Sequence, residues 1–112
     1  MYLLYGIPNC NTVKKAMTHL DKNESEYEFI NFKKQAPTQK LLKEWKTAFG
    51  DFPVNKKGPT FRKIKEDFEN GNAAEKYKLL VEFSSAIKRP ILVKNGKAIC
   101  FGYDEEKYAN FK

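Results

Sequence analysis

Cys10 is the residue of this 112-residue chain whose type and position most clearly indicate chemistry. It stands between a short apolar run, residues 2–5, and a stretch with helical periodicity that begins at Thr12. The first turn of a helix leaves backbone N–H groups without partners and carries a partial positive charge, and both favour an anion. Because these features also lower the pKa of a thiol, the position predicts a nucleophilic thiolate. Position alone leaves one alternative, an inert small apolar side chain in a buried turn.

Cys100, the second cysteine, is predicted to be buried rather than reactive. It lies between Ile99 and Phe101 in a segment typical of a strand, where a small apolar side chain fits an interior position. A role as a resolving thiol would need its Cα within about 7 Å of that of Cys10. The chain has no CxxC pair and His19 is its only histidine, so no metal site is predicted. His19 itself is placed on the polar face of the first helix.

The elements around Cys10 follow from the spacing of apolar residues. Residues 2–5 are typical of a buried strand, and residues 12–22 repeat apolar side chains at helical spacing, with Asn23 as the stop. Residues 27–32 are rich in aromatic and β-branched side chains, which predicts a second strand.

The middle of the chain predicts three helices. The first runs from an N-cap at Thr38 to Gly50, the second is capped by Thr60 and ends at residues 70–71, and the third begins at Asn72. Their apolar faces are predicted to consist of Leu41, Leu42, Trp45, Ala48, Phe49, Phe61, Ile64, Phe68, Ala73, Tyr77, Leu80 and Val81.

The end of the chain predicts a hairpin and a last helix. The hairpin covers residues 91–101 and turns at the Asn-Gly pair, residues 95–96. Asp104 is expected to cap the helix, with Tyr103 and Tyr108 packed together around the cap. The complete order of elements predicts an α/β protein with a mixed four-stranded sheet and helices on both faces.

Composition and length limit the classes of protein to which this chain can belong. Its length suits a single domain, and 41% hydrophobic with 31% charged residues suits a core with a solvated surface. The formal charge of +7 comes from lysines scattered through every segment, which favours a solvated surface over nucleic-acid binding. No apolar stretch approaches the roughly 20 residues of a membrane span, and residues 2–5 are not a signal peptide. The cytoplasm is therefore the expected location.

Three segments carry a resemblance to a known family. YGIPNCNTVKKA at residues 5–16 is similar to the active-site segment of the arsenate reductase (ArsC), Spx and YffB family. NKKGPTFRKI at residues 55–64 resembles the corresponding stretch of the YffB branch, and residues 87–111, with IKRPILVKNGK and FGYDEEKYANF, resemble the family's closing hairpin and helix. The resemblance implies a thioredoxin-like fold in one domain, residues 1–112, with a helical insertion at about residues 36–84 between the second and third strands.

The resemblance also implies the partners of Cys10. Arg89 would reach its sulfur, and the Arg89–Pro90 peptide bond would be cis. Without the resemblance, Pro90 would be interpreted as the start of an edge strand and Arg89 as a solvated charge. Arg62 and Lys56 are further candidates for binding substrate, although a charge on a helix surface is an equal interpretation of Arg62.

Three departures from the family pattern weigh against arsenate as the substrate. In arsenate reductases the position of Gly6 is a histidine, that of Asn55 is an arginine that binds the oxyanion, and that of Phe101 is a third arginine. The loss of two arginines weakens the binding of a tetrahedral anion. The YffB branch, with glutathione-linked thiol reduction, is therefore preferred.

In that hypothesis glutathione is a co-substrate, no cofactor is bound, and no membrane or nucleic-acid partner is expected. Asn9, Asn11 and Thr12 would line the loop with hydrogen-bonding groups, although Thr12 also suits a helix cap and Asn9 a turn. The alternative is a regulator like Spx, which binds RNA polymerase and senses oxidants through a CxxC pair. Val13 stands where the second cysteine of that pair would be, so a disulfide switch is not expected.

Overall fold

The computed structural model describes residues 1–110, so Phe111, the last residue of the closing motif, lies outside it. The contacts divide the chain into two compact units. One contains Met1–Asn31 and the chain from Arg89 onward, and the other is Phe32–Lys88. The first contains the sheet and Cys10, and the second contains three helices.

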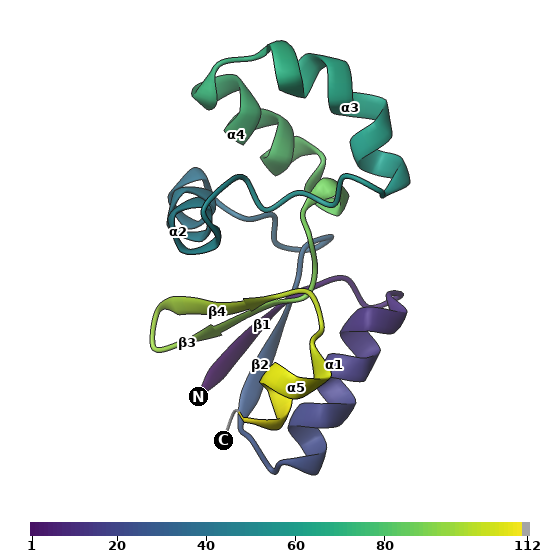
Figure 1. The fold of residues 1–112 in the computed structure, drawn as a ribbon, viewed down its shortest axis with the longest axis vertical. Helices are drawn as coiled ribbons and strands as arrows, with labels where there is room; N and C mark the ends of the chain where they lie inside the picture. The colour runs from purple at the N-terminus through teal and green to yellow at the C-terminus, as the bar shows by residue number, and fades with distance from the viewer. Residues whose placement is uncertain (111–112) are drawn as a thin grey trace. The chain divides into compact units, whose positions relative to one another are not determined.

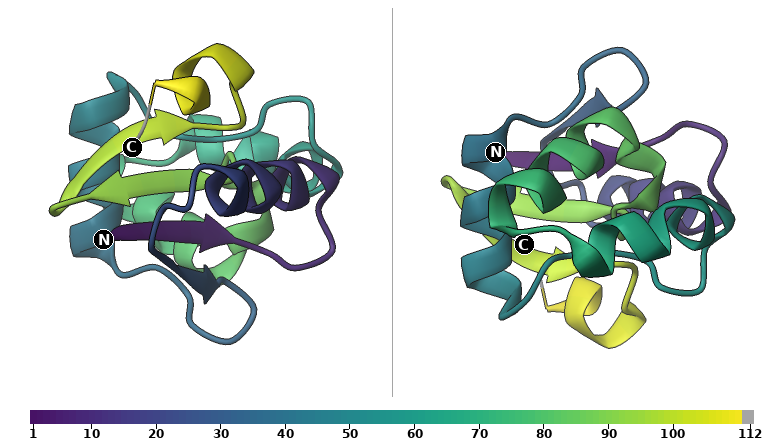
Figure 2. Two further views of the ribbon diagram at one scale, coloured as in Figure 1. Left: turned by 90° about the horizontal axis from the view of Figure 1, so that it is seen from below. Right: turned by 90° about the horizontal axis from the view of Figure 1, so that it is seen from above.

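The sheet unit is built on four strands in the order β2-β1-β3-β4 (Figures 1 and 2). β1 (Tyr2–Gly6) pairs in parallel with β2 (Tyr27–Asn31) and antiparallel with β3 (Ile91–Lys94), which pairs antiparallel with β4 (Lys97–Phe101). The predicted mixed sheet is confirmed. β1 is one residue longer and β2 one residue shorter than predicted, within the usual uncertainty of element ends.

Two helices cover one face of this sheet, α1 (Asn11–Lys22) and α5 (Glu105–Ala109). Alternate residues of the strands point toward them and form one core cluster with their apolar faces. The cluster contains Tyr2, Leu4, Val13, Ala16, Leu20, Leu92, Cys100 and Tyr108. The loop that carries Cys10 is therefore held between a buried strand and a helix that packs onto the sheet.

The hairpin and the cap of α5 form as the sequence predicts. Asn95 and Gly96 both have positive φ, 52° and 80°, as a two-residue hairpin turn requires. The Asp104 side chain accepts hydrogen bonds from the first turn of α5, and the rings of Tyr103 and Tyr108 lie 5.0 Å apart. The predicted hydrophobic contact around the cap is confirmed.

The helical unit contains α2 (Gln39–Phe49), α3 (Pro59–Asn70), α4 (Ala73–Glu82) and a short 3₁₀ turn (Ser84–Ala86) that the sequence did not predict. Thr38 and Asn72 cap α2 and α4, as predicted.

Thr60 is not the cap of α3, which is a correction. The helix begins two residues earlier than a cap at Thr60 would place it, at Pro59, with Gly58 as its N-cap. Proline suits the first helical position because its φ is already helical and it lacks an N–H that would have no partner.

The predicted apolar faces of the helical unit are correct at their centres and wrong at their ends. Phe61, Ile64 and Phe68 are buried, as are the central residues of α2 and α4. Ala48, Phe49 and Ala73 are exposed. Because they lie in the first or last turn of their helices, their positions extend beyond the packed surface. Within residues 1–110 no helix is both long enough and apolar enough to span a membrane.

Candidate active site around Cys10

Cys10 is the N-cap residue of α1, directly after the loop that leaves β1. Its backbone is extended, with φ −121° and ψ 121°, and its carbonyl accepts the first hydrogen bond of the helix from the Lys14 N–H at 3.0 Å. The side chain is half-buried and is not part of a disulfide. Thr12 is the second helical residue, so the interpretation of Thr12 as the cap is wrong.

The surroundings of Cys10 favour its thiolate. Burial alone would raise the pKa of the Cys10 thiol, but hydrogen bonds from the backbone N–H groups of Val13 and Thr12 and from the Arg89 side chain outweigh this effect, together with the charge of Arg89. The pKa is therefore lowered from its ordinary value. The Cys10 side chain makes no regular capping hydrogen bond, and the nearby N–H groups act by favouring the ionised form of the sulfur. A thiolate at neutral pH is the nucleophilic form of cysteine.

Arg89 is positioned by the peptide bond that follows it. The Arg89–Pro90 bond is cis, as the resemblance implied. Pro90 is buried, and its carbonyl accepts a hydrogen bond of 2.8 Å from the Gly102 N–H. This bond joins the residue before β3 to the residue after β4. Arg89 is thus attached to the sheet, and its guanidinium interacts with the sulfur of Cys10.

Cys100 lies in the core, as predicted. Only 3% of its surface is exposed, and its thiol donates a hydrogen bond of 3.3 Å to the Gly102 carbonyl. It packs in the cluster with Leu4, Leu92 and Tyr108. A reagent or a second thiol reaches this sulfur only after the sheet unit opens, so Cys100 is not available as a nucleophile in the folded protein.

The other predicted residues are placed as follows. Asn9 is exposed in the loop before Cys10, and Asn11 is the exposed first residue of α1. Lys56 and Arg62 are exposed in the helical unit, Lys56 before α3 and Arg62 in its first turn. Cys10, Thr12 and Arg89 therefore lie together in the sheet unit, whereas Lys56 and Arg62 belong to the helical unit. No cluster of His, Cys, Asp or Glu within residues 1–110 is arranged to hold a metal ion.

Gly6 and Val13 are two departures from the family pattern that the structure brings into contact. A Cβ added to Gly6 would lie 2.8 Å from Cγ2 of Val13, closer than real contacts allow. Val13 is fully buried, so it has little freedom to move away. Any side chain at position 6, including a histidine, therefore requires a change at Val13 or a shift of α1.

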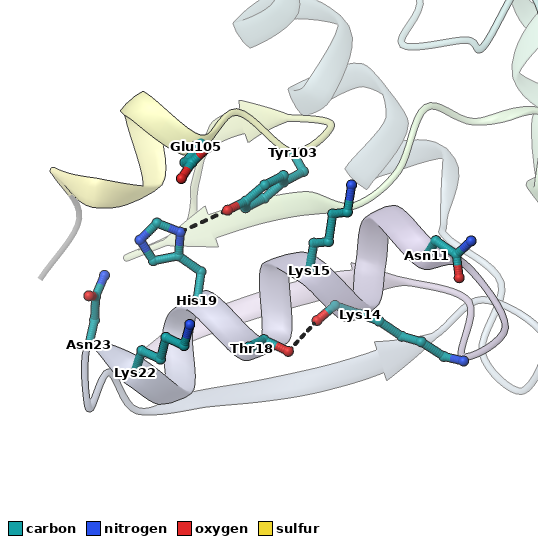
Figure 3. Close-up of a pocket in the computed structure, with 9 residues that line it drawn as sticks. All are labelled: Asn11, Lys14, Lys15, Thr18, His19, Lys22, Asn23, Tyr103 and Glu105. Carbon is teal, nitrogen blue, oxygen red and sulfur yellow. Dashed lines mark hydrogen bonds between the residues drawn. The ribbon is translucent and has the colours of Figure 1, made fainter.

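His19 has a partner that sequence analysis missed. Its Nδ1 lies 2.9 Å from the Tyr103 hydroxyl, and the two side chains line a groove beside α1 (Figure 3). His19 is half-buried rather than freely exposed on the polar face. The two residues are 84 positions apart, so no local pattern joins them.

A four-stranded mixed sheet with a cysteine at the start of the first helix and a cis-proline before the third strand defines a thioredoxin-like protein. A glutaredoxin from Archaeoglobus fulgidus shares the fold, with a TM-score of 0.50 at 18% identity over 95% of this chain and 78% of that one. The model of the ArsC family matches residues 5–111, and the chain belongs to this family.

The relatives of the chain include proteins of different names. A solved structure of a protein called YffB is 34% identical, with a TM-score of 0.86 over 97% of this chain and 96% of that one. A structure described as a possible arsenate reductase from Streptococcus mutans is 30% identical. Its TM-score is 0.81, over 97% of this chain and 98% of that one. The global transcriptional regulator Spx 2 of Bacillus anthracis is 25% identical over 118 residues, 99% of this chain and 86% of that protein. The family therefore contains both reductases and regulators.

Proposed function

We propose that this protein is a glutathione-dependent thiol–disulfide reductase in which Cys10 is the catalytic nucleophile. The observation that carries the proposal is the position of Cys10 at the N-terminus of α1, where two backbone N–H groups and Arg89 lower the pKa of its thiol. An accessible thiolate with a nearby cation is what thiol–disulfide exchange requires of an enzyme.

The reaction balances with glutathione as the reductant. The Cys10 thiolate attacks the glutathione sulfur of a mixed disulfide, the substrate sulfur leaves as a thiolate and takes up a proton, and Cys10 is left bound to glutathione. A second glutathione, as thiolate, attacks this new disulfide, which releases oxidised glutathione and restores the Cys10 thiolate. In the net reaction, one mixed disulfide and one free glutathione give one substrate thiol and one molecule of oxidised glutathione. Arg89 stabilises the thiolate of Cys10 before the first step and as the leaving group of the second.

A second protein thiol is not needed in this scheme. Cys100 is buried in the core, so an external thiol resolves the intermediate. The exposed amides of Asn9 and Asn11, with the Thr12 hydroxyl, supply hydrogen-bonding groups beside the sulfur for the backbone of a bound thiol. Lys56 and Arg62 are proposed to bind carboxylates of substrate or glutathione. The high glutathione concentration of the cytoplasm makes that compartment the proposed location.

Arsenate is proposed to be a poor substrate. Hydrogen bonds to charged groups are worth roughly 1.5–3 kcal/mol each, so the two absent arginines correspond to roughly 10²–10⁴-fold in oxyanion affinity. The contact of Gly6 with Val13 also leaves no room for the histidine that arsenate reductases carry.

A transcriptional role like that of Spx is the second candidate, and the similarity to Spx 2 supports it. Val13 occupies the position of the second cysteine and is fully buried, so a disulfide switch within the first turn of α1 is not expected. A regulator of this kind would bind RNA polymerase independently of oxidants.

The test compares two substrates with one enzyme. Turnover of a glutathionylated peptide and of arsenate is measured with the same glutathione supply, using the wild-type protein and Cys10→Ser. The proposal expects peptide reduction well above arsenate reduction, and no turnover by Cys10→Ser. Arsenate turnover equal to that of the peptide would move the protein to the arsenate reductases. Retention of RNA polymerase on the immobilised protein, without peptide turnover, would favour the regulator.

A further inference from the structure

A groove beside α1 gathers positive charge that the proposed reaction does not use. It has a volume of about 670 Å³ and lies between α1 and the segment that enters α5 (Figure 3). Lys14, Lys15 and Lys22 line it from α1, and Tyr103 and Glu105 line it from the other side. We call it the α1 groove.

The three lysines of the α1 groove outnumber the acidic residue in its lining. All three side chains are exposed, and within residues 1–110 none of them forms an ion pair. Glu105 is the one acidic residue that lines the groove, against three lysines. The groove therefore has a positive potential that attracts carboxylates.

Helical spacing arranges the lining in two parallel rows. Asn11, Lys15 and His19 are four residues apart and form one row, and Lys14 and Lys22 belong to the next. His19 is held by its hydrogen bond to Tyr103, so the wall of the groove is fixed where these two meet.

The α1 groove begins beside the nucleophile. Asn11, at one end of the lining, directly follows Cys10, and Lys22 is the last residue of the helix. A helix of 12 residues is about 18 Å long, which an extended peptide of roughly five residues also spans. A peptide whose disulfide reacts at Cys10 can therefore place the next several side chains along the lysines.

The composition of the lining favours an acidic peptide over a nucleic acid. Proteins that hold duplex DNA by charge commonly contact six to ten phosphates, far more than three lysines in a groove one helix long can neutralise. Glu105 would also repel a continuous polyanion, whereas a peptide with separate carboxylates can avoid it. The Tyr103 hydroxyl and the Asn11 amide add hydrogen-bonding groups that suit a peptide backbone.

We propose that the α1 groove binds acidic residues that flank the disulfide of a peptide or protein substrate. The proposal rests on the reduction of disulfides by Cys10 for its biological meaning, but the binding itself does not depend on that chemistry. Lys14, Lys15 and Lys22 are then specificity residues that select substrates by charge.

Binding is measured without any thiol step. Two fluorescent peptides both carry serine in place of the reactive cysteine. In one peptide Asp and Glu flank this serine on both sides, and in the other Asn and Gln do. The affinity of the Cys10→Ser protein for each peptide is measured by fluorescence anisotropy. An exposed ion pair changes affinity by roughly 1.5- to 5-fold. Replacing all three groove lysines with glutamine should therefore lower the affinity for the acidic peptide by about tenfold. The matched control replaces Lys34, Lys40 and Lys65, exposed lysines that do not line the groove, and should leave the affinity unchanged.

The outcomes separate this proposal from the proposed function. Equal affinity for the two peptides, or equal losses in the groove and control variants, overturns the α1 groove as a specific site. Tighter binding of an oligonucleotide, dependent on the same three lysines, also overturns it. The corresponding glutathionylated peptides are then compared in turnover. Selective binding of the acidic peptide without reduction of either one contradicts the proposed function and leaves the groove supported, whereas reduction of both without selective binding contradicts the groove alone.

Discussion

α1 and α5 begin with the same geometry but with different acceptors. The Asp104 carboxylate accepts hydrogen bonds from the N–H groups of Glu106 and Lys107, at 3.0 and 3.2 Å. These are the second and third residues of α5. The second and third residues of α1, Thr12 and Val13, direct the same two N–H groups toward the thiolate of Cys10.

The two helices differ in the chemistry of the acceptor, which is a carboxyl group in α5 and a thiol in α1. In α5 the acceptor is the carboxyl group of Asp104, whose oxygen caps the helix by accepting from the first turn. The N–H groups of Thr12 and Val13 lower the pKa of Cys10, so they stabilise the thiolate more than the thiol. A weakly acidic side chain at an N-cap therefore has a lowered pKa, because the N–H groups of the first helical turn stabilise its ionised form. The acceptor at the start of α5 caps its helix, whereas the acceptor at the start of α1 is a thiol whose pKa the helix lowers.

The largest expected effect is the difference in reactivity between the two cysteines. Cys10 should react with iodoacetamide at least roughly a hundredfold faster than Cys100 near neutral pH, because Cys100 is 3% exposed and reacts only when the structure opens. Mass spectrometry of the alkylated peptides over time measures both rates in one sample. Cys10→Ser should leave only the slow reaction, and Cys100→Ala only the fast one. Equal rates in the folded protein would contradict the assignment of Cys10 as the reactive thiol.

Local signals made much of the fold predictable from sequence. Thr38, Asn72 and Asp104 cap their helices as predicted, and Asn95 with Gly96 forms the hairpin turn. In each case the side chain or the permitted φ acts on the backbone within three residues. The chemistry of such a position can therefore be predicted without knowing the tertiary structure.

The errors arise where a neighbouring residue or a distant element decides the outcome. Thr12 and Thr60 both suit a cap, but Cys10 and Gly58 take that position in their helices. His19 lies on the polar face of α1 by periodicity, and only the packing of the segment before α5 gives it Tyr103 as a partner. The contact of Gly6 with Val13 depends in the same way on how α1 packs against β1.

The next effect is on the pKa of Cys10. Arg89→Ala removes a cation and a hydrogen-bond donor from the sulfur, so the pKa of Cys10 should rise. Titration of the thiolate by its ultraviolet absorbance measures the shift. Arg89→Lys keeps the charge without the planar fork and should give a smaller rise. No rise in Arg89→Ala would show that the backbone N–H groups alone lower the pKa.

The same shift makes stability depend on pH. Since the pKa of Cys10 is lower in the folded than in the unfolded protein, its contribution to stability is complete above the unfolded value, about 8.5, and is lost as the pH falls through the folded value. The free energy of unfolding of wild type, relative to Cys10→Ser, should therefore rise with pH between these two values. Denaturant unfolding over this range measures the rise, and Arg89→Ala should reduce it.

The smallest expected effect concerns the cap of α5. Asp104→Ala should lower the free energy of unfolding by about 1 kcal/mol, because it leaves the N–H groups of Glu106 and Lys107 without their acceptor. Asp104→Asn keeps an oxygen acceptor and should lose much less. Denaturant unfolding of the three proteins, with the slope of the transition held in common, measures the differences.

Cys10→Ala provides the matched substitution at the start of α1. At a pH below the folded pKa of Cys10 the thiol is protonated, so its sulfur carries no charge for the first-turn N–H groups to stabilise. Cys10→Ala should then lower the free energy of unfolding by less than Asp104→Ala does, because it removes packing contacts but no capping hydrogen bond. Cys10→Ser, whose hydroxyl can accept from the first turn, should be more stable than Cys10→Ala by roughly 1 kcal/mol. If Cys10→Ala and Asp104→Ala lower the free energy of unfolding equally, the neutral thiol already acts as a cap. The lowered pKa would then have to come from Arg89 rather than from the helix.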